Sequence, residues 1–305
     1  MQIQYVILWI DDEIEKFESV GDVERINSFL VDLGFTPTIR TLKDGTNLND
    51  ELDNYNFDLI ISDYNIVDGH HGDDLIKQIR ERGIFTEVLF YSSQTDLNSI
   101  ALKLLTVDRI SFHSGRRELM EKIETLIGLT VSKLLELTAT RGLITSETSD
   151  LDVVMEELVM DLVYNKLKLS KEEIDGIIST YIDERLKTAP DQFQKKYEEL
   201  GFEKWFCKIE ANRKWGVFRD LLKKLGGDEV AAFLKGNKTY GDEVIGIRNK
   251  FAHAKAIEQN GKIYLAGFGA EGDKFEFDAD HCIAIRKNLI AHRENFAGLK
   301  SFLTP

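Results

Sequence analysis

Two kinds of apolar pattern alternate along residues 1–130. Five short segments are predicted to be strands, and the third, with three consecutive aliphatic residues, is typical of a strand in a parallel sheet covered by helices on both faces. These segments are Val6–Ile10, Pro37–Leu42, Leu59–Ser62, Val88–Tyr91 and Arg109–Phe112. Helical spacing and stop signals predict helices at Ser19–Leu33, Asp74–Arg82, Ile100–Leu105 and Arg117–Ile127. The alternation predicts an α/β domain with a doubly wound, five-stranded parallel sheet.

Beyond residue 150 the apolar positions recur mainly at helical spacing. The predicted helices include Leu151–Leu167, a helix opened by the capping box Ser170–Glu173, Val217–Leu225, Tyr240–Lys255 and Asp278–Phe302. Gly261–Phe268 and Lys274–Phe277 alternate like the two strands of a hairpin. Four aromatic residues at helical spacing are expected in the core: Trp205, Phe206, Trp215 and Phe218. This half is predicted to be a mainly α-helical bundle with a small β-hairpin.

The two halves are expected to be joined by a long helix and a linker. The helix that begins at Arg117 continues in pattern through Val131–Leu137, and the Thr- and Ser-rich segment Thr138–Asp150 is predicted to break it. The expected organisation is a first domain at 1–137 with its exit helix, a linker at 138–150 and a helical domain at 151–305. The exit helix either forms a dimer stalk or packs on its own domain.

Charge is distributed unevenly over the 305 residues, whose formal net charge is −14. Residues 1–140 hold 25 acidic and 13 basic side chains, and residues 141–305 hold 28 and 26. The acidic first half suits cation binding, whereas the second lacks the strongly basic character of an obvious nucleic-acid binder. Cys207 and Cys282 form no disulfide framework or metal motif, and no apolar run reaches 18 residues. We therefore expect a cytoplasmic protein with no membrane partner.

Polar side chains stand where the predicted strands end. Asp11 and Asp12 follow the first strand, Asp63 ends the third and Ser92 ends the fourth. Open α/β sheets bind ligands at the carboxyl edge of their strands, so these side chains are candidates for one site. The pair His70-His71 with Asp73-Asp74 also suggests metal ligation, but a solvated loop is the stronger interpretation.

Residues 1–130 resemble the receiver domain of two-component response regulators. The resemblance implies that Asp63 is the phosphoacceptor and that a histidine kinase is the partner. It also implies a Mg²⁺ site formed by Asp11, Asp12, Asp63 and the main-chain carbonyl of Asn65. Hard oxygen ligands suit Mg²⁺, and the cation would screen charge as the carboxylate attacks a phosphohistidine. Ser92 would then bond the phosphoryl group and switch the nearby surface.

Three positions differ from the receiver pattern. His113-Ser114 stands where the family has Lys-Pro, and a protonated His113 is the candidate to neutralise phosphoryl charge. Ile110 occupies the aromatic switch position, with Phe112 nearby. Val67-Asp68-Gly69 lacks the proline that follows the phosphoacceptor. The alternative is a receiver-shaped docking module that is no longer phosphorylated.

The helix predicted at Tyr240–Lys255 has one apolar stripe. At about 100° per residue, Val244, Ile247, Phe251 and Ala254 fall on the stripe that faces the core. Two polar residues, Asn249 and His253, are i,i+4 neighbours on nearly the opposite side, with Arg248 between them and the core. His253 is therefore expected at the surface or in a site completed from outside the bundle.

This segment resembles the Arg-x4-His motif of HEPN domains, in which an arginine is followed by a polar residue and, a few positions later, by a histidine in a late helix. The resemblance implies a homodimeric, metal-independent endoribonuclease with a role in stress or phage defence, gated by phosphorylation of Asp63. His253 would be the general acid or base, Arg248 would stabilise phosphate charge, and Asn249 would orient the phosphate or the imidazole. This output domain would need no cofactor besides its RNA substrate. The alternative is a non-catalytic regulator whose helical domain binds a partner protein or a nucleotide.

Overall fold

The computed structural model describes residues 3–64, 66, 72–92, 102, 104, 107–181, 199–266 and 274–304, with the side chains of 72 and 73 left aside. The chain divides into two compact units, Met1–Thr140 and Arg141–Pro305. The helix predicted at Ile100–Leu105 falls mostly outside the described residues.

The first unit is built around a five-stranded parallel sheet in the order β2-β1-β3-β4-β5. Its strands are β1 (Gln4–Ile10), β2 (Thr36–Leu42), β3 (Leu59–Asp63), β4 (Glu87–Ser92) and β5 (Ile110–Ser114). The order 2-1-3-4-5 is the flavodoxin-like form of the doubly wound fold. The predicted fold of this half is confirmed, and every predicted strand is present.

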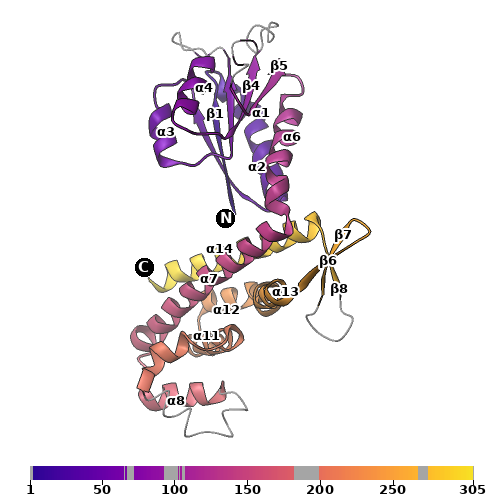
Figure 1. Ribbon diagram of the computed structural model, residues 1–305. Coiled ribbons are helices and arrows are strands. Elements are labelled where there is room, and N and C mark those ends of the chain that lie inside the picture. The colour runs from indigo at the N-terminus through magenta and orange to yellow at the C-terminus, as the bar shows by residue number, and fades with distance from the viewer. Residues whose placement is uncertain are drawn as a thin grey trace. The chain divides into compact units, whose positions relative to one another are not determined.

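Helices cover both faces of this sheet. They are α1 (Ile14–Val20), α2 (Asp22–Asp32), α3 (Leu48–Asn54), α4 (Gly72–Glu81) and α6 (Leu119–Ser132). Figure 1 shows α3 and α4 on one side of the sheet, and α2 and α6 on the other. Alternate residues of the three inner strands β1, β3 and β4 enter two separate apolar clusters, one around Trp9 and Tyr91 and one around Leu8 and Phe90. This double burial is why these inner strands are almost continuously apolar.

The exit helix α6 packs on its own domain. Leu119, Ile123, Ile127 and Val131 are all buried in the cluster that contains Trp9. A short 3₁₀ turn, η1 (Lys133–Leu135), follows it before the next helix begins at Leu137. Of the two roles considered for this helix, the structure shows the packing role.

The second unit is mainly helical with a small antiparallel sheet. Its elements are α7 (Leu137–Asp161), the π-helical segment η2 (Leu162–Lys166), α8 (Lys171–Thr180), α11 (Ala211–Leu225), α12 (Asp228–Gly236), the π-helical segment η3 (Gly241–Gly246), α13 (Ile247–His253), β6 (Lys255–Gln259), β7 (Lys262–Ala266), β8 (Lys274–Phe277) and α14 (Ala279–Leu303). The predicted hairpin is the β7-β8 pair, and β6 adds a third strand. The capping box at Ser170 and Glu173 is confirmed.

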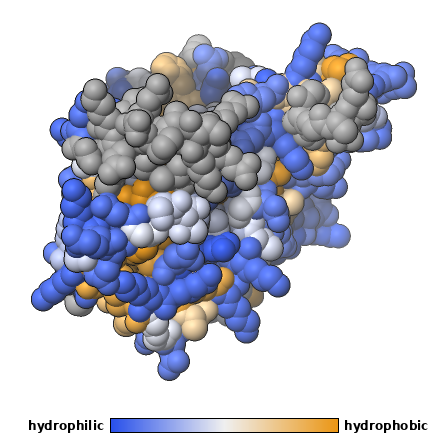
Figure 2. Space-filling model, turned by 90° about the horizontal axis from the view of Figure 1, so that it is seen from below, coloured by the Kyte–Doolittle hydropathy of each residue, from blue (hydrophilic) through white to orange (hydrophobic). Residues whose placement is uncertain are grey.

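Aromatic side chains form the core of the helical unit. The Trp215 ring lies 4.5 Å from that of Tyr240, and the Phe233 ring lies 5.1 Å from that of Phe296, centroid to centroid. The four aromatic residues expected in the core from their spacing are all buried: Trp205, Phe206, Trp215 and Phe218. The face in Figure 2 is largely hydrophilic, with small separate hydrophobic areas.

The linker predicted at Thr138–Asp150 is instead part of a helix. α7 runs without a break from Leu137 to Asp161. Hydroxyl groups of this segment donate to main-chain carbonyl oxygens one helical turn earlier. Thr145 Oγ1 donates to the oxygen of Arg141 (2.9 Å), and Thr148 Oγ1 donates to that of Ile144 (2.7 Å). Local bonds of this kind let Ser and Thr remain in a helix interior. No helix in the described part of the chain is long and apolar enough to cross a bilayer.

Candidate functional site

Three carboxylates gather at the carboxyl edge of the parallel sheet. Asp11 follows β1, and Asp63 is the last residue of the adjacent strand β3. Asp11, Asp12 and Asp63 each place a carboxylate oxygen within 4.8 Å of the others. Asp11 and Asp63 are buried, and Asp12 is partly exposed. The sheet therefore brings together the three acidic side chains that the sequence placed at separate strand ends.

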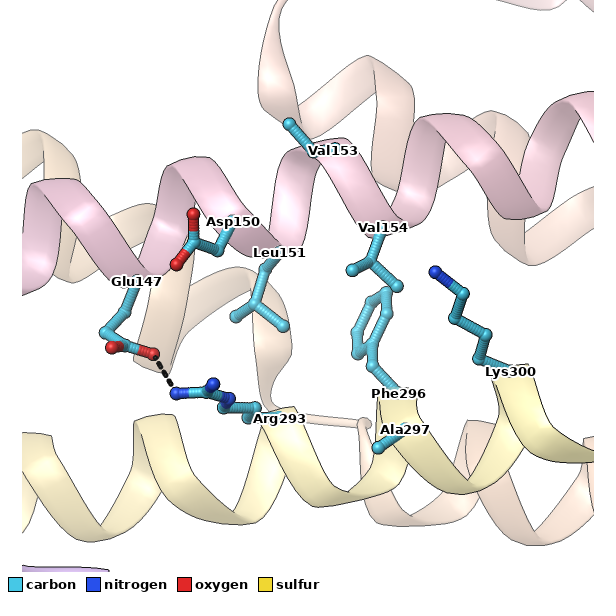
Figure 3. Close-up of a pocket in the computed structure, with 9 residues that line it drawn as sticks. All are labelled: Glu147, Asp150, Leu151, Val153, Val154, Arg293, Phe296, Ala297 and Lys300. Carbon is cyan, nitrogen blue, oxygen red and sulfur yellow. Dashed lines mark hydrogen bonds and ion pairs between the residues drawn. The ribbon is translucent and has the colours of Figure 1, made fainter. Parts of the chain in front are cut away.

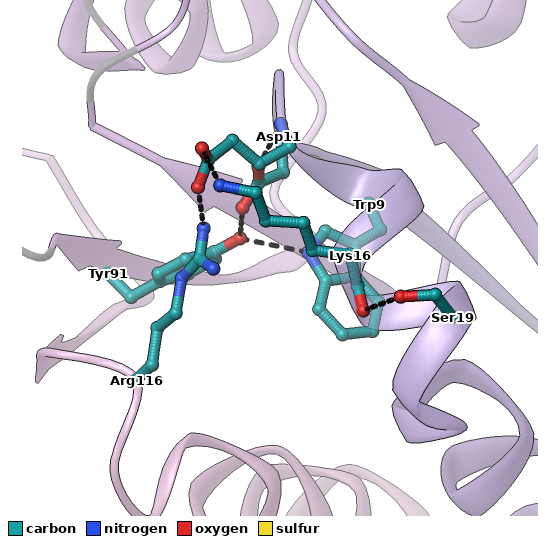
Figure 4. A network of polar contacts seen from close by, with 7 residues as sticks. Trp9, Asp11, Lys16, Ser19, Tyr91 and Arg116 are labelled. Carbon is teal, nitrogen blue, oxygen red and sulfur yellow. Dashed lines mark hydrogen bonds and ion pairs between the residues drawn. The ribbon is translucent and has the colours of Figure 1, made fainter.

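Both oxygens of the Asp11 carboxylate have a donor. The backbone amide of Glu13 donates to Oδ1 at 2.6 Å, and the Tyr91 hydroxyl donates to Oδ2. The indole Nε1 of Trp9 donates in turn to the Tyr91 oxygen at 3.1 Å, as Figure 4 shows. Burial raises the pKa of Asp11, while the Tyr91 and Glu13 hydrogen bonds and the charge of Arg116 lower it. Tyr91 is thus part of the site, although its apolar strand context gave no sign of this.

This donor set suits a magnesium ion. Three carboxylates at one point offer the hard oxygen ligands that Mg²⁺ prefers, and they leave room for water or a phosphate oxygen to complete its coordination. Without a cation, like charges held this close repel one another. The fourth predicted ligand, Asn65, lies outside the described residues, as do His70 and His71.

The two predicted switch residues occupy the ends of β4 and β5. Ser92 is fully buried as the last residue of β4, next in sequence to Tyr91, which pairs with Asp63 in the sheet. His113 pairs with Tyr91 from β5, and its Nε2 lies 2.8 Å from the main-chain oxygen of Arg117. A backbone carbonyl only accepts, so this nitrogen carries a proton and donates.

A basic residue missed from sequence lies beside the acidic group. Arg116, in the loop after β5, forms an ion pair with Glu13 and stacks its guanidinium over the Phe17 ring at 4.9 Å. Lys16 pairs with the same Glu13. Figure 4 shows Arg116 with its ion pair as a dashed line, together with Asp11 and Tyr91. Only the bend of the chain after β5 brings Arg116 here, so its sequence spacing carried no signal.

In the second unit, α13 exposes two of the three predicted catalytic residues. Asn249 and His253 are exposed, whereas Phe251 is buried with its ring 5.7 Å from that of Phe277. Arg248 is partly buried, and its Nη1 donates to Asp152 Oδ2 of α7 at 3.3 Å. The helix phase inferred from the apolar stripe therefore places these side chains correctly. The preceding residues, Gly241–Gly246, form a π-helical turn rather than regular α-helix.

Asp152 holds Arg248 within a wider group of charges. Burial raises the pKa of Asp152, and the nearby charges of Lys214 and Arg248 lower it. Lys214 is itself buried and pairs with Glu156, one helical turn after Asp152. Neither Asp152 nor Lys214 is marked by the sequence pattern, because their contacts join helices far apart in the chain.

A second arginine and histidine near each other in the sequence, Arg286 and His292, are both buried in α14. His292 is buried, with Nδ1 2.7 Å from Asn237 Oδ1 and Nε2 2.9 Å from Glu243 Oε2. Arg286 is buried in the same helix, α14. Neither side chain is open to a substrate.

A groove between α7 and α14 has a cavity of about 400 Å³ (Figure 3). Its apolar lining includes Leu151, Val154 and Phe296, and Glu147 pairs with Arg293 across it at 3.3 Å. Burial raises the pKa of Glu147. None of the predicted site residues lines this groove.

Comparison with known proteins gives only distant structural likenesses. No family model and no curated protein matches this sequence. The response regulator DrrB of Thermotoga maritima, an OmpR/PhoB homologue, is 16% identical with a TM-score of 0.34, over 44% of this chain and 54% of that chain. The match therefore spans about half the length of DrrB.

Two further structures align with similar parts of the chain. The BeF3-activated DrrB receiver domain is 15% identical with a TM-score of 0.34, over 43% of this chain and 99% of that chain. Full-length FixJ from B. japonicum is 19% identical with a TM-score of 0.33, over 56% and 84%. At these sequence identities and TM-scores, the likeness carries no argument about the function of this chain.

Proposed function

We propose that the first unit is a receiver domain in which Asp63 accepts a phosphoryl group from a histidine kinase. The observation that carries this proposal is the convergence of Asp11, Asp12 and Asp63 within 4.8 Å at the carboxyl edge of the sheet. A carboxylate nucleophile needs neighbours that can hold a divalent cation, because its substrate is itself an anion. The same three side chains supply both the nucleophile and the metal ligands.

The phosphoryl transfer exchanges one bond at phosphorus for another. A carboxylate oxygen of Asp63 attacks the phosphorus of a phosphohistidine, the P–N bond breaks, and an acyl phosphate forms on Asp63. Bound Mg²⁺ would screen the negative charges that meet in this step. Asp11 is held ready for the cation by Tyr91 and Glu13. The buried Ser92 hydroxyl supplies a hydrogen bond to a phosphoryl oxygen and thereby couples Asp63 to the end of β4.

Beryllofluoride with Mg²⁺ tests this proposal, because it mimics a phosphoryl group on an aspartate. Trp9 is a built-in reporter, since its indole is hydrogen-bonded through Tyr91 to Asp11. We expect Mg²⁺ and then beryllofluoride to change its fluorescence in the wild type, with the second change lost in Asp63→Ala. A Trp9→Phe variant identifies the signal against Trp205 and Trp215. An unresponsive wild type would contradict the proposal.

For the second unit we propose a HEPN-type, metal-independent endoribonuclease that acts as a homodimer. The supporting observation is that α13 exposes Asn249 and His253 while Arg248 is held by Asp152. His253 removes the proton of the ribose 2′-OH or protonates the leaving oxygen, and Arg248 stabilises charge on phosphorus. A second copy supplies the facing helix. Phosphorylation of Asp63 gates this site, and defence against phage is the setting in which such control would serve.

RNA cleavage by purified wild type and by His253→Ala, in EDTA and in Mg²⁺, tests the nuclease. The expected result is cutting in EDTA by the wild type and none by the variant. His281→Ala is the matched control, because His281 is a partly exposed histidine of the same unit outside α13. If neither protein cuts RNA, with or without beryllofluoride, the unit is a non-catalytic module that binds a partner protein or a nucleotide.

A further inference from the structure

We infer that Arg116, rather than His113, is the cation that binds the phosphoryl group on Asp63. The inference rests on the proposed receiver function. Phosphorylation replaces the single negative charge of the Asp63 carboxylate with about two on the phosphoryl group, beside the carboxylates of Asp11 and Asp12, and one divalent cation cannot balance this total. A further cation would balance part of the remaining charge, and the loop after β5, which is bonded to the end of β4, holds one in Arg116.

The backbone of this loop directs Arg116 toward the acidic group. Gly115, which precedes it, has a φ of +75°, a conformation that favours glycine. Its amide donates to the carbonyl oxygen of Ser92 at 2.7 Å, so the loop is tied to the end of β4. The Arg116 guanidinium then lies over Phe17 and pairs with Glu13, two residues after Asp11. The backbone amide of Glu13 donates to the Asp11 carboxylate, so the ion pair with Glu13 holds Arg116 beside the acidic group.

His113 is already engaged elsewhere. Its Nε2 donates to the main-chain oxygen of Arg117, 2.8 Å away. Turning the ring toward a phosphoryl group would break this bond and would need a second proton to give the ring a positive charge. Arg116 keeps its positive charge at every relevant pH.

The ion pair with Glu13 allows the Arg116 guanidinium to move to the phosphoryl group. Lys16 also pairs with Glu13, so this carboxylate keeps a partner when Arg116 leaves. The phosphoryl group offers Arg116 twice the charge of Glu13 and a planar pair of oxygens, which a guanidinium binds bidentately. The ion pair with Glu13 is thus a resting position for Arg116, and phosphorylation moves the guanidinium to Asp63.

Beryllofluoride affinity in the full-length protein tests this assignment, with Trp9 fluorescence as the readout at saturating Mg²⁺. Arg116→Ala is expected to weaken beryllofluoride binding about tenfold or more, the loss expected for a charge-assisted hydrogen bond. Mg²⁺ affinity should stay the same or rise slightly, because a nearby positive charge has been removed. Arg116→Lys should restore part of the loss. His113→Ala and Arg117→Ala, the latter removing a neighbouring exposed arginine, should bind like the wild type.

A double-mutant cycle separates phosphoryl binding by Arg116 from a general change of charge. Glu13→Gln frees Arg116 and should tighten beryllofluoride binding, and most of this gain should vanish when Arg116 is alanine. Equal affinities of wild type and Arg116→Ala, or loss of binding in His113→Ala instead, would overturn the inference while leaving the receiver function standing. A wild type whose Trp9 fluorescence does not change with beryllofluoride would contradict the receiver function itself.

Discussion

At the residue scale, the Asp11 carboxyl is a predicted cation ligand that lowers the stability of the metal-free fold when it is charged. It is fully buried beside Asp12 and Asp63, and burial is the main cause of its raised pKa. A carboxyl whose pKa is higher in the folded chain than in the unfolded chain stabilises the fold at low pH. That contribution is lost as pH rises through the folded pKa. At neutral pH the charged Asp11 therefore carries a cost that a bound cation removes.

Asp11→Asn should accordingly stabilise the metal-free protein at neutral pH. The amide oxygen can still accept from the Glu13 amide, the amide nitrogen can donate to the Tyr91 oxygen, and one of three repelling charges is removed. We expect the midpoint of thermal unfolding in EDTA to rise by about 2–4 °C, which corresponds to about 1 kcal/mol. The gain should disappear below the ordinary pKa of aspartate, and added Mg²⁺ should stabilise the variant less than the wild type. A variant less stable than wild type in EDTA at neutral pH would contradict this account.

Tyr91→Phe should weaken cation binding without removing a ligand. The Tyr91 hydroxyl donates to Asp11 and lowers the pKa of its carboxyl. Its loss raises that pKa further, so protons compete with Mg²⁺ up to a higher pH. We expect the pH midpoint of Mg²⁺ binding to shift upward and the free energy of unfolding to fall by about 1 kcal/mol. Calorimetric titration with Mg²⁺ across pH measures the shift, and an unchanged midpoint would show that Tyr91 does not tune Asp11.

At the scale of elements, α7 departs from the sequence-based prediction, and the burial pattern of α13 agrees with it. The segment 138–150 was expected to be a linker because Thr and Ser favour turns. In α7 their hydroxyls bond back to the preceding turn, and Ile144 and Leu143 are buried, so packing overrides the weak propensity. The spacing of α13, in contrast, placed Phe251 inside and His253 outside as observed.

Ser146→Pro tests the continuity of α7. Ser146 is exposed in the middle of this helix. Proline removes a backbone donor and clashes with the preceding turn, which costs about 3 kcal/mol in a helix interior. Ser146→Ala, the matched control, should be neutral or slightly stabilising. Urea unfolding compares the two variants, and an unchanged stability of the proline variant would mean that 138–150 is the loop first expected.

The orientation of α13 is tested by a pair of substitutions on its two faces. Phe251→Ala removes a buried ring and should cost about 3–5 kcal/mol of unfolding free energy. Asn249→Ala, on the exposed face, should change stability by no more than about 0.5 kcal/mol. Equal costs in urea unfolding would contradict the burial pattern on which the proposed nuclease depends.

Most of the fold was predictable from the sequence, because buried parallel strands have a distinctive apolar pattern. The helices α1 and α3 were missed, since each has only two buried residues: Ile14 and Phe17 in α1, and Leu48 and Leu52 in α3. Asp11, Asp12 and Asp63 could be found from strand ends alone. Tyr91, Arg116 and Asp152 could not, because each joins its site through a contact between distant segments.

At the scale of the whole molecule, two compact units each carry one candidate site. The acidic group lies in the first unit, and the exposed face of α13 lies in the second. The proposed activities can therefore be measured separately in the intact chain. Asp63→Ala should abolish the beryllofluoride response, and His253→Ala should abolish RNA cleavage while leaving that response intact. The central claim remains the chemistry of Asp63, on which any control of the second unit depends.

The most direct test of that claim is the intact mass of the protein after incubation with a small-molecule phosphodonor such as acetyl phosphate. The wild type should gain one phosphoryl group in Mg²⁺ and none in EDTA. The group should be lost in alkali, as an acyl phosphate is, and Asp63→Asn should gain none. An unmodified wild type in Mg²⁺, or equal modification of Asp63→Asn, would contradict the account.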